Sequence, residues 1–160
     1  MSTLDVIDTL VEEILRLRIA SKKTIVGCTD EQMQEIEAVH GRPLPALYDA
    51  FMRRMGQGAG HLFRGTEIFY PEVLDLREAA QELLLENQIT TPVSPEWVVF
   101  SMHQGYQFLF FDEHTADPPV RWYFEGKGFS QMSDSFSAFL AREVAEHGGF
   151  VARGVLKPQL

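Results

Sequence analysis

Residues 97–112, WVVFSMHQGYQFLFFD, predict a β-hairpin that would form the centre of a sheet. Two apolar runs, 97–103 and 106–112, flank the pair Gln104-Gly105, and a two-residue loop that contains glycine favours a tight turn. The cross-strand pairs expected from that turn are Val98 with Phe111, Val99 with Phe110, Phe100 with Leu109 and Met102 with Gln107. Because both faces of the hairpin are largely apolar, we expect other elements to cover both of them.

The segments outside this hairpin carry the periodicity of helices and of a second hairpin. Apolar residues recur there at helical spacing, and Thr29 with Gln32 has the pattern of a capping box. The expected elements are helices over 4–19, 29–40, 45–55, 72–87 and 133–147, a short strand over 67–70 and a second hairpin over 120–132. We expect the last helix to end at Gly148 as its C-cap.

Helices and strands in this order, rather than in regular alternation, predict an α+β fold. We expect a single domain over residues 1–160, with a mainly antiparallel sheet of about four to six strands and helices packed on it. The one cysteine, Cys28, cannot form an internal disulfide and fits a reducing, cytoplasmic setting. There is no run of about 18 apolar residues, and acids interrupt the N-terminal segment, so we expect neither a membrane span nor a signal peptide.

Acidic residues outnumber basic ones, with 23 Asp and Glu against 14 Lys and Arg and a net charge of −9. The middle third of the chain, residues 61–120, holds ten of the acids but only two of the bases, Arg64 and Arg77. Clustered Lys and Arg bind nucleic acid and anionic membranes, so this distribution disfavours both as partners. It favours a basic protein partner, or it serves only to keep the protein in solution.

The expected helix over 72–87 concentrates this charge on one face. Its apolar residues fall on one side, and by the 3.6-residue period five acids fall on the other. These acids are Glu72, Asp75, Glu78, Glu82 and Glu86. Like charges on one face repel one another, and only Arg77 is near enough in the sequence to offset them. We therefore predict that these acids bind the partner, with a plain solvated helix face as the alternative.

The sequence shows no motif for catalysis, a cofactor or a metal. The G-x-S-x-G, H-E-x-x-H, P-loop and paired C-x-x-C patterns do not occur. We interpret Cys28 as buried or idle, and the glycines at 56, 58 and 60 as a helix end rather than a phosphate-binding loop. One loop carries four potential metal ligands, namely Asp112, Glu113, His114 and Asp117. They fix no coordination geometry, so we expect solvated charges there and no cofactor or metal, with a small enzyme or metal-binding protein that uses this loop as the alternative.

Several stretches, taken in order, resemble one family. They are TDEQMQEIEAVHG followed by RPLPALYDAFMRRMG (29–56), GTEIFYPEV (65–73), and WVVFSMHQGYQFLFFD (97–112) with its Gly105 and terminal Asp112. The second hairpin and closing helix, 120–147, follow in the same order. Over residues 28–147 the chain is similar to the SUKH superfamily, which comprises bacterial immunity proteins and the yeast glucan-synthesis and killer-toxin-resistance regulator. The expected helix 4–19 lies outside this part as an extension.

The resemblance implies an α+β domain that binds other proteins and catalyses no reaction. Bacterial members are mostly predicted to neutralise secreted toxins, often nucleases, by binding the toxin domain. Nucleases are commonly basic where they hold phosphate, so the acidic middle of this chain suits such a partner. A regulatory scaffold that binds an endogenous protein, such as a cell-wall synthesis factor, is the other role that the resemblance implies.

Overall fold

The computed structural model describes residues 2–160 and contains two antiparallel sheets with helices packed around them. The main sheet has the strand order β3 (Thr66–Glu67), β4 (Val98–His103), β5 (Gln107–Phe111), β6 (Val120–Phe124) and β7 (Gly128–Ser133). A small sheet pairs β1 (Ile25–Val26) with β2 (Gly58–Ala59). The helices are α1 (Thr3–Arg16), α2 (Asp30–His40), α3 (Ala46–Met55), the 3-10 helix η1 (Glu72–Asp75), α4 (Leu76–Glu86) and α5 (Phe136–Ala152). The expected α+β class with an antiparallel main sheet is confirmed.

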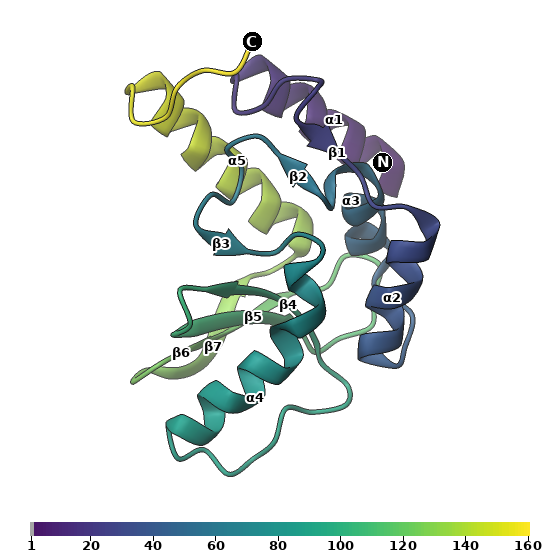
Figure 1. The fold of residues 1–160 in the computed structure, drawn as a ribbon, viewed down its shortest axis with the longest axis vertical. Coiled ribbons are helices and arrows are strands. Elements are labelled where there is room, and N and C mark those ends of the chain that lie inside the picture. Colours follow the sequence, from purple (N-terminus) through teal and green to yellow (C-terminus); the bar gives the residue numbers. More distant parts are fainter. Residues whose placement is uncertain (1) are drawn as a thin grey trace.

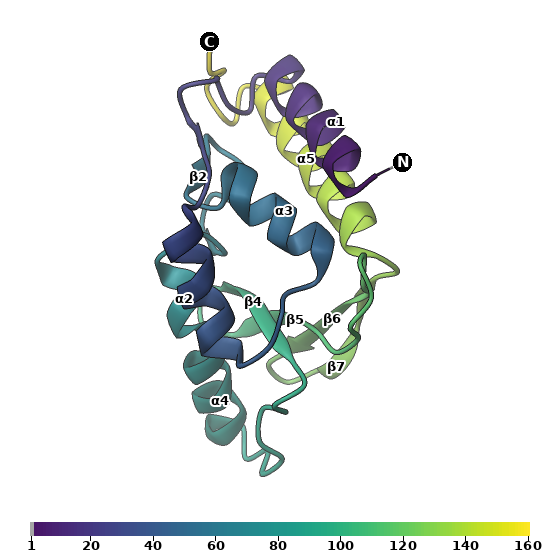
Figure 2. The same ribbon diagram turned by 90° about the vertical axis from the view of Figure 1, so that its right-hand side faces the viewer.

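Helices lie on both sides of the main sheet, as Figures 1 and 2 show. α3 and α5 cover one face, and α4 packs against β4 from the other. Both central strands are accordingly buried along most of their length, which confirms that the 97–112 hairpin is covered on both faces. No helix within residues 2–160 is both long enough and apolar enough to span a membrane.

Four aromatic side chains hold α3 and α5 on the sheet. Tyr48 from α3 and Phe136 from α5 meet Phe100 and Phe111 of the central hairpin, and all four are fully buried. The Phe100 and Phe111 rings stack with their centroids 4.3 Å apart, and Phe136 meets Phe111 edge-on at 5.2 Å. Such pairs add about 0.5–1.5 kcal/mol each beyond the area they bury, so this cluster fixes the helix layer over the sheet.

The N-terminal helix packs on the core, and its C-terminal end lies against the last helix at Gly148. α1 begins with a capping box at Ser2 and ends at Arg16 rather than at residue 19, and it packs against α3 and α5. The expected C-cap at Gly148 is wrong, because α5 runs through this residue to Ala152. A Cβ at Gly148 would lie 2.7 Å from Leu17 Cδ1, so the glycine makes room for the end of α1. The cap of α5 is Ser135, slightly later than expected.

The central hairpin forms with a different register from the one expected. The turn at Gln104 and Gly105 has positive φ at both residues, and Tyr106 N–H donates to His103 O. Tyr106 is then left out of the ladder, so the pairs near the turn are His103 with Gln107, Met102 with Phe108 and Ser101 with Leu109. An irregularity at Phe100 restores the expected pairs Val98–Phe111 and Val99–Phe110. The expected pairs of Met102 with Gln107 and Phe100 with Leu109 are therefore wrong.

This bulge changes which side chains reach the α5 side of the sheet. Phe100 stacks on Phe111 and meets Phe136, so it faces the α3 and α5 layer. Ser101 pairs with Leu109, which shares that face with Phe111, so Ser101 faces the same way. Consecutive residues normally alternate, and a bulge is the usual way to redirect a side chain. Beyond it, polar rather than apolar residues of β4 face α5.

Candidate functional site

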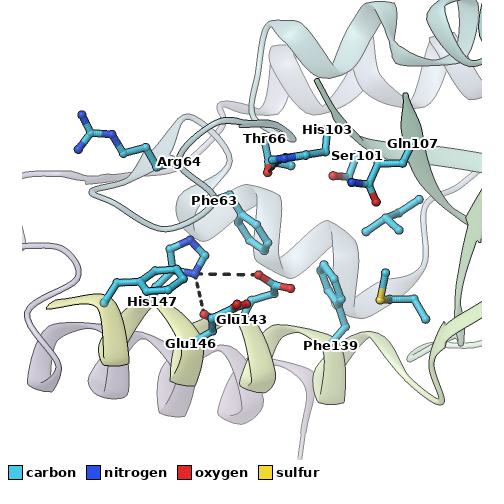
Figure 3. Close-up of a pocket in the computed structure, with 13 residues that line it drawn as sticks. Phe63, Arg64, Thr66, Ser101, His103, Gln107, Phe139, Glu143, Glu146 and His147 are labelled. Carbon is cyan, nitrogen blue, oxygen red and sulfur yellow. Dashed lines mark hydrogen bonds and ion pairs between the residues drawn. The ribbon is translucent and has the colours of Figure 1, made fainter. Parts of the chain in front are cut away.

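A hollow of about 410 Å³ opens between α5 and the edge of the main sheet formed by β3, β4 and β5 (Figure 3). Its lining includes the aromatic residues Phe63, Phe139 and Phe150, the polar residues Thr66, Ser101, His103, Gln107 and His147, and the charged residues Arg64, Glu143 and Glu146. The sequence analysis selected none of these residues, because they come from separate segments and form no motif. We call this site the α5 hollow.

The five acids predicted to bind a partner are all exposed, but they do not lie on one α-helix. Glu72 and Asp75 belong to η1, where Leu76 N–H donates to Val73 O in the tighter i→i+3 pattern. The other three, Glu78, Glu82 and Glu86, lie on α4 at spacings of four residues. The expected continuous helix over 72–87 is thus two elements. We call these five residues the acidic surface.

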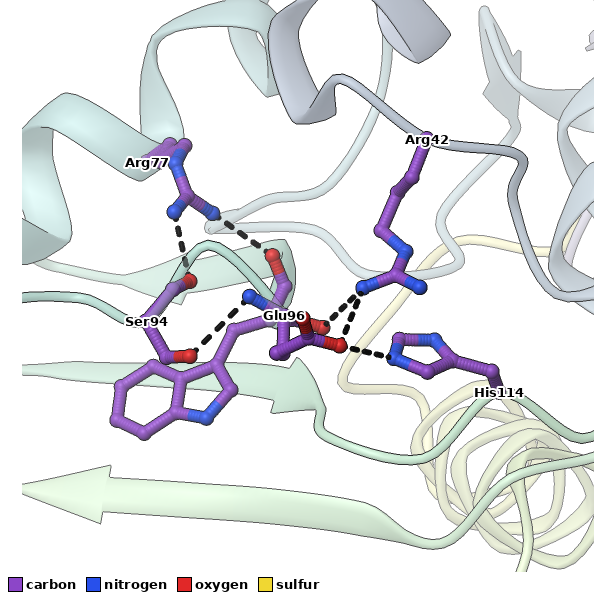
Figure 4. A network of polar contacts seen from close by, with 6 residues as sticks. Arg42, Arg77, Ser94, Glu96 and His114 are labelled. Carbon is purple, nitrogen blue, oxygen red and sulfur yellow. Dashed lines mark hydrogen bonds and ion pairs between the residues drawn. The ribbon is translucent and has the colours of Figure 1, made fainter.

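Arg77, the one base near this surface, does not neutralise it. Its guanidinium turns inward and donates to Trp97 O at 2.7 Å and Ser94 O at 2.6 Å (Figure 4). Among residues 2–160, no salt bridge involves any of the five acids. The last turn of α4 also contains Glu86 and no basic residue, although helix C-termini favour positive charge. Within the described residues, the acidic surface is therefore not paired with any basic side chain.

A second set of polar contacts, centred on Glu96, fixes the segment before β4. Glu96 accepts a hydrogen bond from Arg42 at 3.0 Å and contacts His114 Nε2 at 3.1 Å (Figure 4). The hydrogen bond from Arg42, followed by that from His114, lowers the pKa of Glu96. His114 is one of the four potential metal ligands in the loop 112–117, and here it serves this contact.

Two of the three carboxylates of that loop, those of Asp112 and Asp117, have other partners. Asp112 lies 3.5 Å from Arg121, and Asp117 accepts from the backbone N–H and hydroxyl of Ser137. Over the described range 2–160, no group of three or more His, Cys, Asp or Glu side chains is arranged to hold a metal ion. Three of the four potential metal ligands, His114, Asp112 and Asp117, thus make contacts with other side chains or backbone of the protein.

A shallow groove adjoins the acidic surface between α2 and α4. Its apolar lining is Val39, Leu74 and Val93, and Glu78 lies on its edge. Val39 is 36% exposed, so the groove offers apolar area to a partner. Tyr70 O–H donates to Glu35 Oε1 at 2.9 Å and joins α2 to the segment before η1. Sequence reasoning missed this groove, because its walls are about 35 residues apart in the chain.

Cys28, just before α2, is buried, as the sequence analysis expected. Burial raises the pKa of its thiol to about 11, with Arg53 opposing the shift. A buried thiol of that pKa is a poor nucleophile at neutral pH. Gly56 ends α3 as expected, and a Cβ there would lie 2.5 Å from Cys28 Sγ.

No curated protein matches the sequence significantly. The model of the SMI1/KNR4 family, also called SUKH-1, matches residues 27–142. The matched part begins after α1, includes the main sheet and the acidic surface, and ends within α5. It covers well over half of the chain, and the chain therefore belongs to the SMI1/KNR4 family (SUKH-1).

Proposed function

We propose that this protein is a non-catalytic, cytoplasmic immunity protein that binds and blocks a basic toxin domain through its acidic surface. The observation that carries the proposal is the inward orientation of Arg77, which leaves five exposed acids without a counter-charge. Membership of a family of protein-binding domains supports a protein as the partner. A toxin that acts on nucleic acid would present the basic surface that these acids complement.

The physical reason is that the acids cost the free protein stability. Neighbouring like charges at i,i+4 spacing on a helix repel by a few tenths of a kcal/mol per pair, and Glu78, Glu82 and Glu86 have this spacing. Glu86 adds an unfavourable interaction with the C-terminal end of the α4 dipole. A basic partner would remove both penalties when it binds, which favours a role for these acids in association.

The groove and the acids would contribute to binding in different ways. Apolar contacts with Val39, Leu74 and Val93 would exclude water and hold the complex together, so they would mainly set the dissociation rate. The surrounding acids would attract a basic partner from a distance, so they would mainly set the association rate and its salt dependence.

The first experiment identifies the partner by capture on the purified protein from the lysate and secretome of the source cell. Capture of a basic toxin domain at low salt, with release at high salt, supports the proposal. A housekeeping envelope or signalling protein would instead favour the regulatory scaffold of the glucan-synthesis type. A toxin gene beside the gene of this protein would point to immunity.

The second experiment tests the surface itself with two triple variants. One reverses Glu78, Glu82 and Glu86 to Lys, and the control reverses Asp8, Glu12 and Glu125, which are exposed elsewhere. Both change the net charge equally. We expect association with the toxin domain at low salt to slow by about tenfold or more in the first variant and far less in the control. Equal slowing in both would mean that only the overall charge matters, and the acidic surface would be the wrong assignment.

A further inference from the structure

The α5 hollow lies on the opposite side of the main sheet from α4, so it is separate from the acidic surface (Figures 1 and 3). On its helix side, the Glu143 side chain is only 22% exposed. No hydrogen bond reaches this carboxylate from any residue in the described range 2–160. Nδ1 of His147 lies 4.0 Å from this carboxylate and donates to Glu143 O at 2.7 Å. A partly buried carboxylate without a donor is an unusual and costly arrangement.

The surroundings of Glu143 make its negative charge harder to hold. Burial raises the pKa of this carboxyl, and the nearby carboxylate of Glu146 raises it further, with His147 and Arg142 opposing. Arg64 also lines the hollow, but its guanidinium points away and lies 3.4 Å from His61 Nδ1 (Figure 3). Among the residues that line the hollow, no Lys or Arg side chain is therefore directed at the Glu143 carboxylate, and His147, at 4.0 Å, is the basic group beside it.

The sheet side of the hollow supplies polar groups because of the bulge in β4. Ser101 is 2% exposed, and its side chain points into the hollow (Figure 3). Its hydroxyl has no hydrogen-bond partner among residues 2–160. Gln107 is held by a hydrogen bond from Trp122 Nε1 to its Oε1 at 2.7 Å, and Thr66 contacts His103 Nδ1 at 2.8 Å. Fixed polar groups that converge on a hollow are typical of a binding site.

Aromatic rings form the wall between the two sides. Phe63 and Phe139 stack with centroids 5.9 Å apart, and both are nearly fully buried. Phe63 has a φ of 59°, a conformation that a bulky aromatic residue rarely adopts. Strained residues of this kind cluster at binding sites, where the surrounding structure holds them in place. Rings beside a carboxylate attract a positive group through their negative faces.

We propose that the α5 hollow binds a single guanidinium or ammonium group, which pairs with Glu143 and Glu146 and lies against the Phe63–Phe139 wall. Such a group supplies the donors that the Glu143 carboxylate lacks, and Ser101 can accept from it. The cation can belong to a lysine or arginine side chain of a protein or to a free amine of the cell. Glu143 and Glu146 lie beyond residue 142, so they are outside the part of the chain that matches the family.

The test is a titration of the full-length protein, followed by amide chemical shifts in two-dimensional NMR spectra. The probes are N-acetyl-arginine amide, which represents a peptide side chain, and propylguanidine, which represents a free guanidine or amine with the same single charge. N-acetyl-citrulline amide is the neutral isostere. We expect both cations to shift the resonances of Ser101, His103 and Phe139, and the isostere to leave them in place. Tighter binding of the capped residue than of propylguanidine assigns the site to a protein ligand, and the reverse order assigns it to a free guanidine or amine.

Two variants separate the carboxylate from general effects of charge. Glu143→Gln keeps the shape of the side chain and should weaken cation binding by about tenfold or more, because a charge-assisted hydrogen bond is lost. Glu12→Gln removes an exposed acid from α1 and should leave the affinity unchanged. If Glu143→Gln unfolds the protein, Glu146→Gln on the exposed rim serves in its place, with a smaller loss expected. Equal binding of the citrulline compound, binding of inorganic phosphate at these residues, or unchanged affinity in the Glu143 variant would overturn the proposal.

Discussion

His40, the last residue of α2, is a buried histidine without hydrogen bonds, and its replacement by leucine should change how stability depends on pH. The side chain is 6% exposed, and neither ring nitrogen has a partner among residues 2–160. Burial, with a smaller contribution from Arg77, lowers the pKa of His40 from 6.5 to about 4. The ring is therefore neutral in the folded protein at neutral pH, and folding competes with its protonation in acid.

The sign and size of the effect follow from this shift. Because the pKa of His40 is lower in the folded state than in the unfolded state, the unfolded state binds more protons between about pH 6.5 and pH 4. Stability is complete above that window and falls as the pH falls through it. At 1.36 kcal/mol per pKa unit, the full loss is about 3 kcal/mol, of which about 2 kcal/mol falls between about pH 7 and pH 5.

Urea denaturation at several pH values compares the wild type with two variants. His40→Leu should gain about 1 kcal/mol at neutral pH, because two unpaired polar atoms leave the core, and should lose the wild-type slope in acid. His40→Gln removes the titration but keeps a buried polar group, so it should lose the slope without the gain. Relative to the wild type, each variant should become more stable by about 2 kcal/mol from about pH 7 to pH 5. A pH-independent difference would refute the burial of a neutral His40.

Three further outcomes are expected from the packing. Gly27→Ala would place a Cβ 1.8 Å from Arg53 O, so the free energy of unfolding in urea should fall by about 3 kcal/mol or more. The control Gly41→Ala has open space around its Cβ and should lose only about 1 kcal/mol. Cys28 should react slowly with a thiol reagent in the folded protein and quickly in urea, since burial raises its pKa to about 11; fast reaction in the native state would contradict its burial. Arg77→Met should lower the melting temperature by removing the donors to Trp97 O and Ser94 O, at a cost of about 2 kcal/mol; a neutral result would mean that these hydrogen bonds add no net stability.

Local patterns in the sequence predicted the elements well but not their exact pairing. The central hairpin follows from two apolar runs and a glycine turn, and the capping box of Thr29 and Gln32 forms as expected. The register near the turn failed, because Tyr106 is left out of the ladder and a bulge at Phe100 compensates further along. A one-residue shift leaves the local pattern almost as good, so only packing against α3 and α5 decides it.

For the candidate surfaces too, local patterns predicted some features, and tertiary packing decided the others. The helical period predicted that the five acids would be exposed, and they are. It could not predict that Arg77 would turn inward, because its two acceptors are 20 and 17 residues away in the chain. The α5 hollow was beyond sequence reasoning for the same reason. Ser101 reaches it only through the bulge, and Glu143 meets it only once α5 has packed on the sheet.

The acidic surface and the α5 hollow use opposite layers of the sheet, and this separation decides how they can be combined. A single rigid partner that filled both would have to pass around the β3 edge of the sheet, whereas two ligands would act independently. The two cases differ in whether the losses of toxin-binding free energy from mutations at the two sites add to one another. If the loss from Glu143→Gln in toxin binding adds to the loss from reversing Glu78, Glu82 and Glu86, one partner contacts both sites. If Glu143→Gln weakens only the binding of the arginine probe, the hollow serves a second ligand, and the immunity role rests on the acidic surface alone.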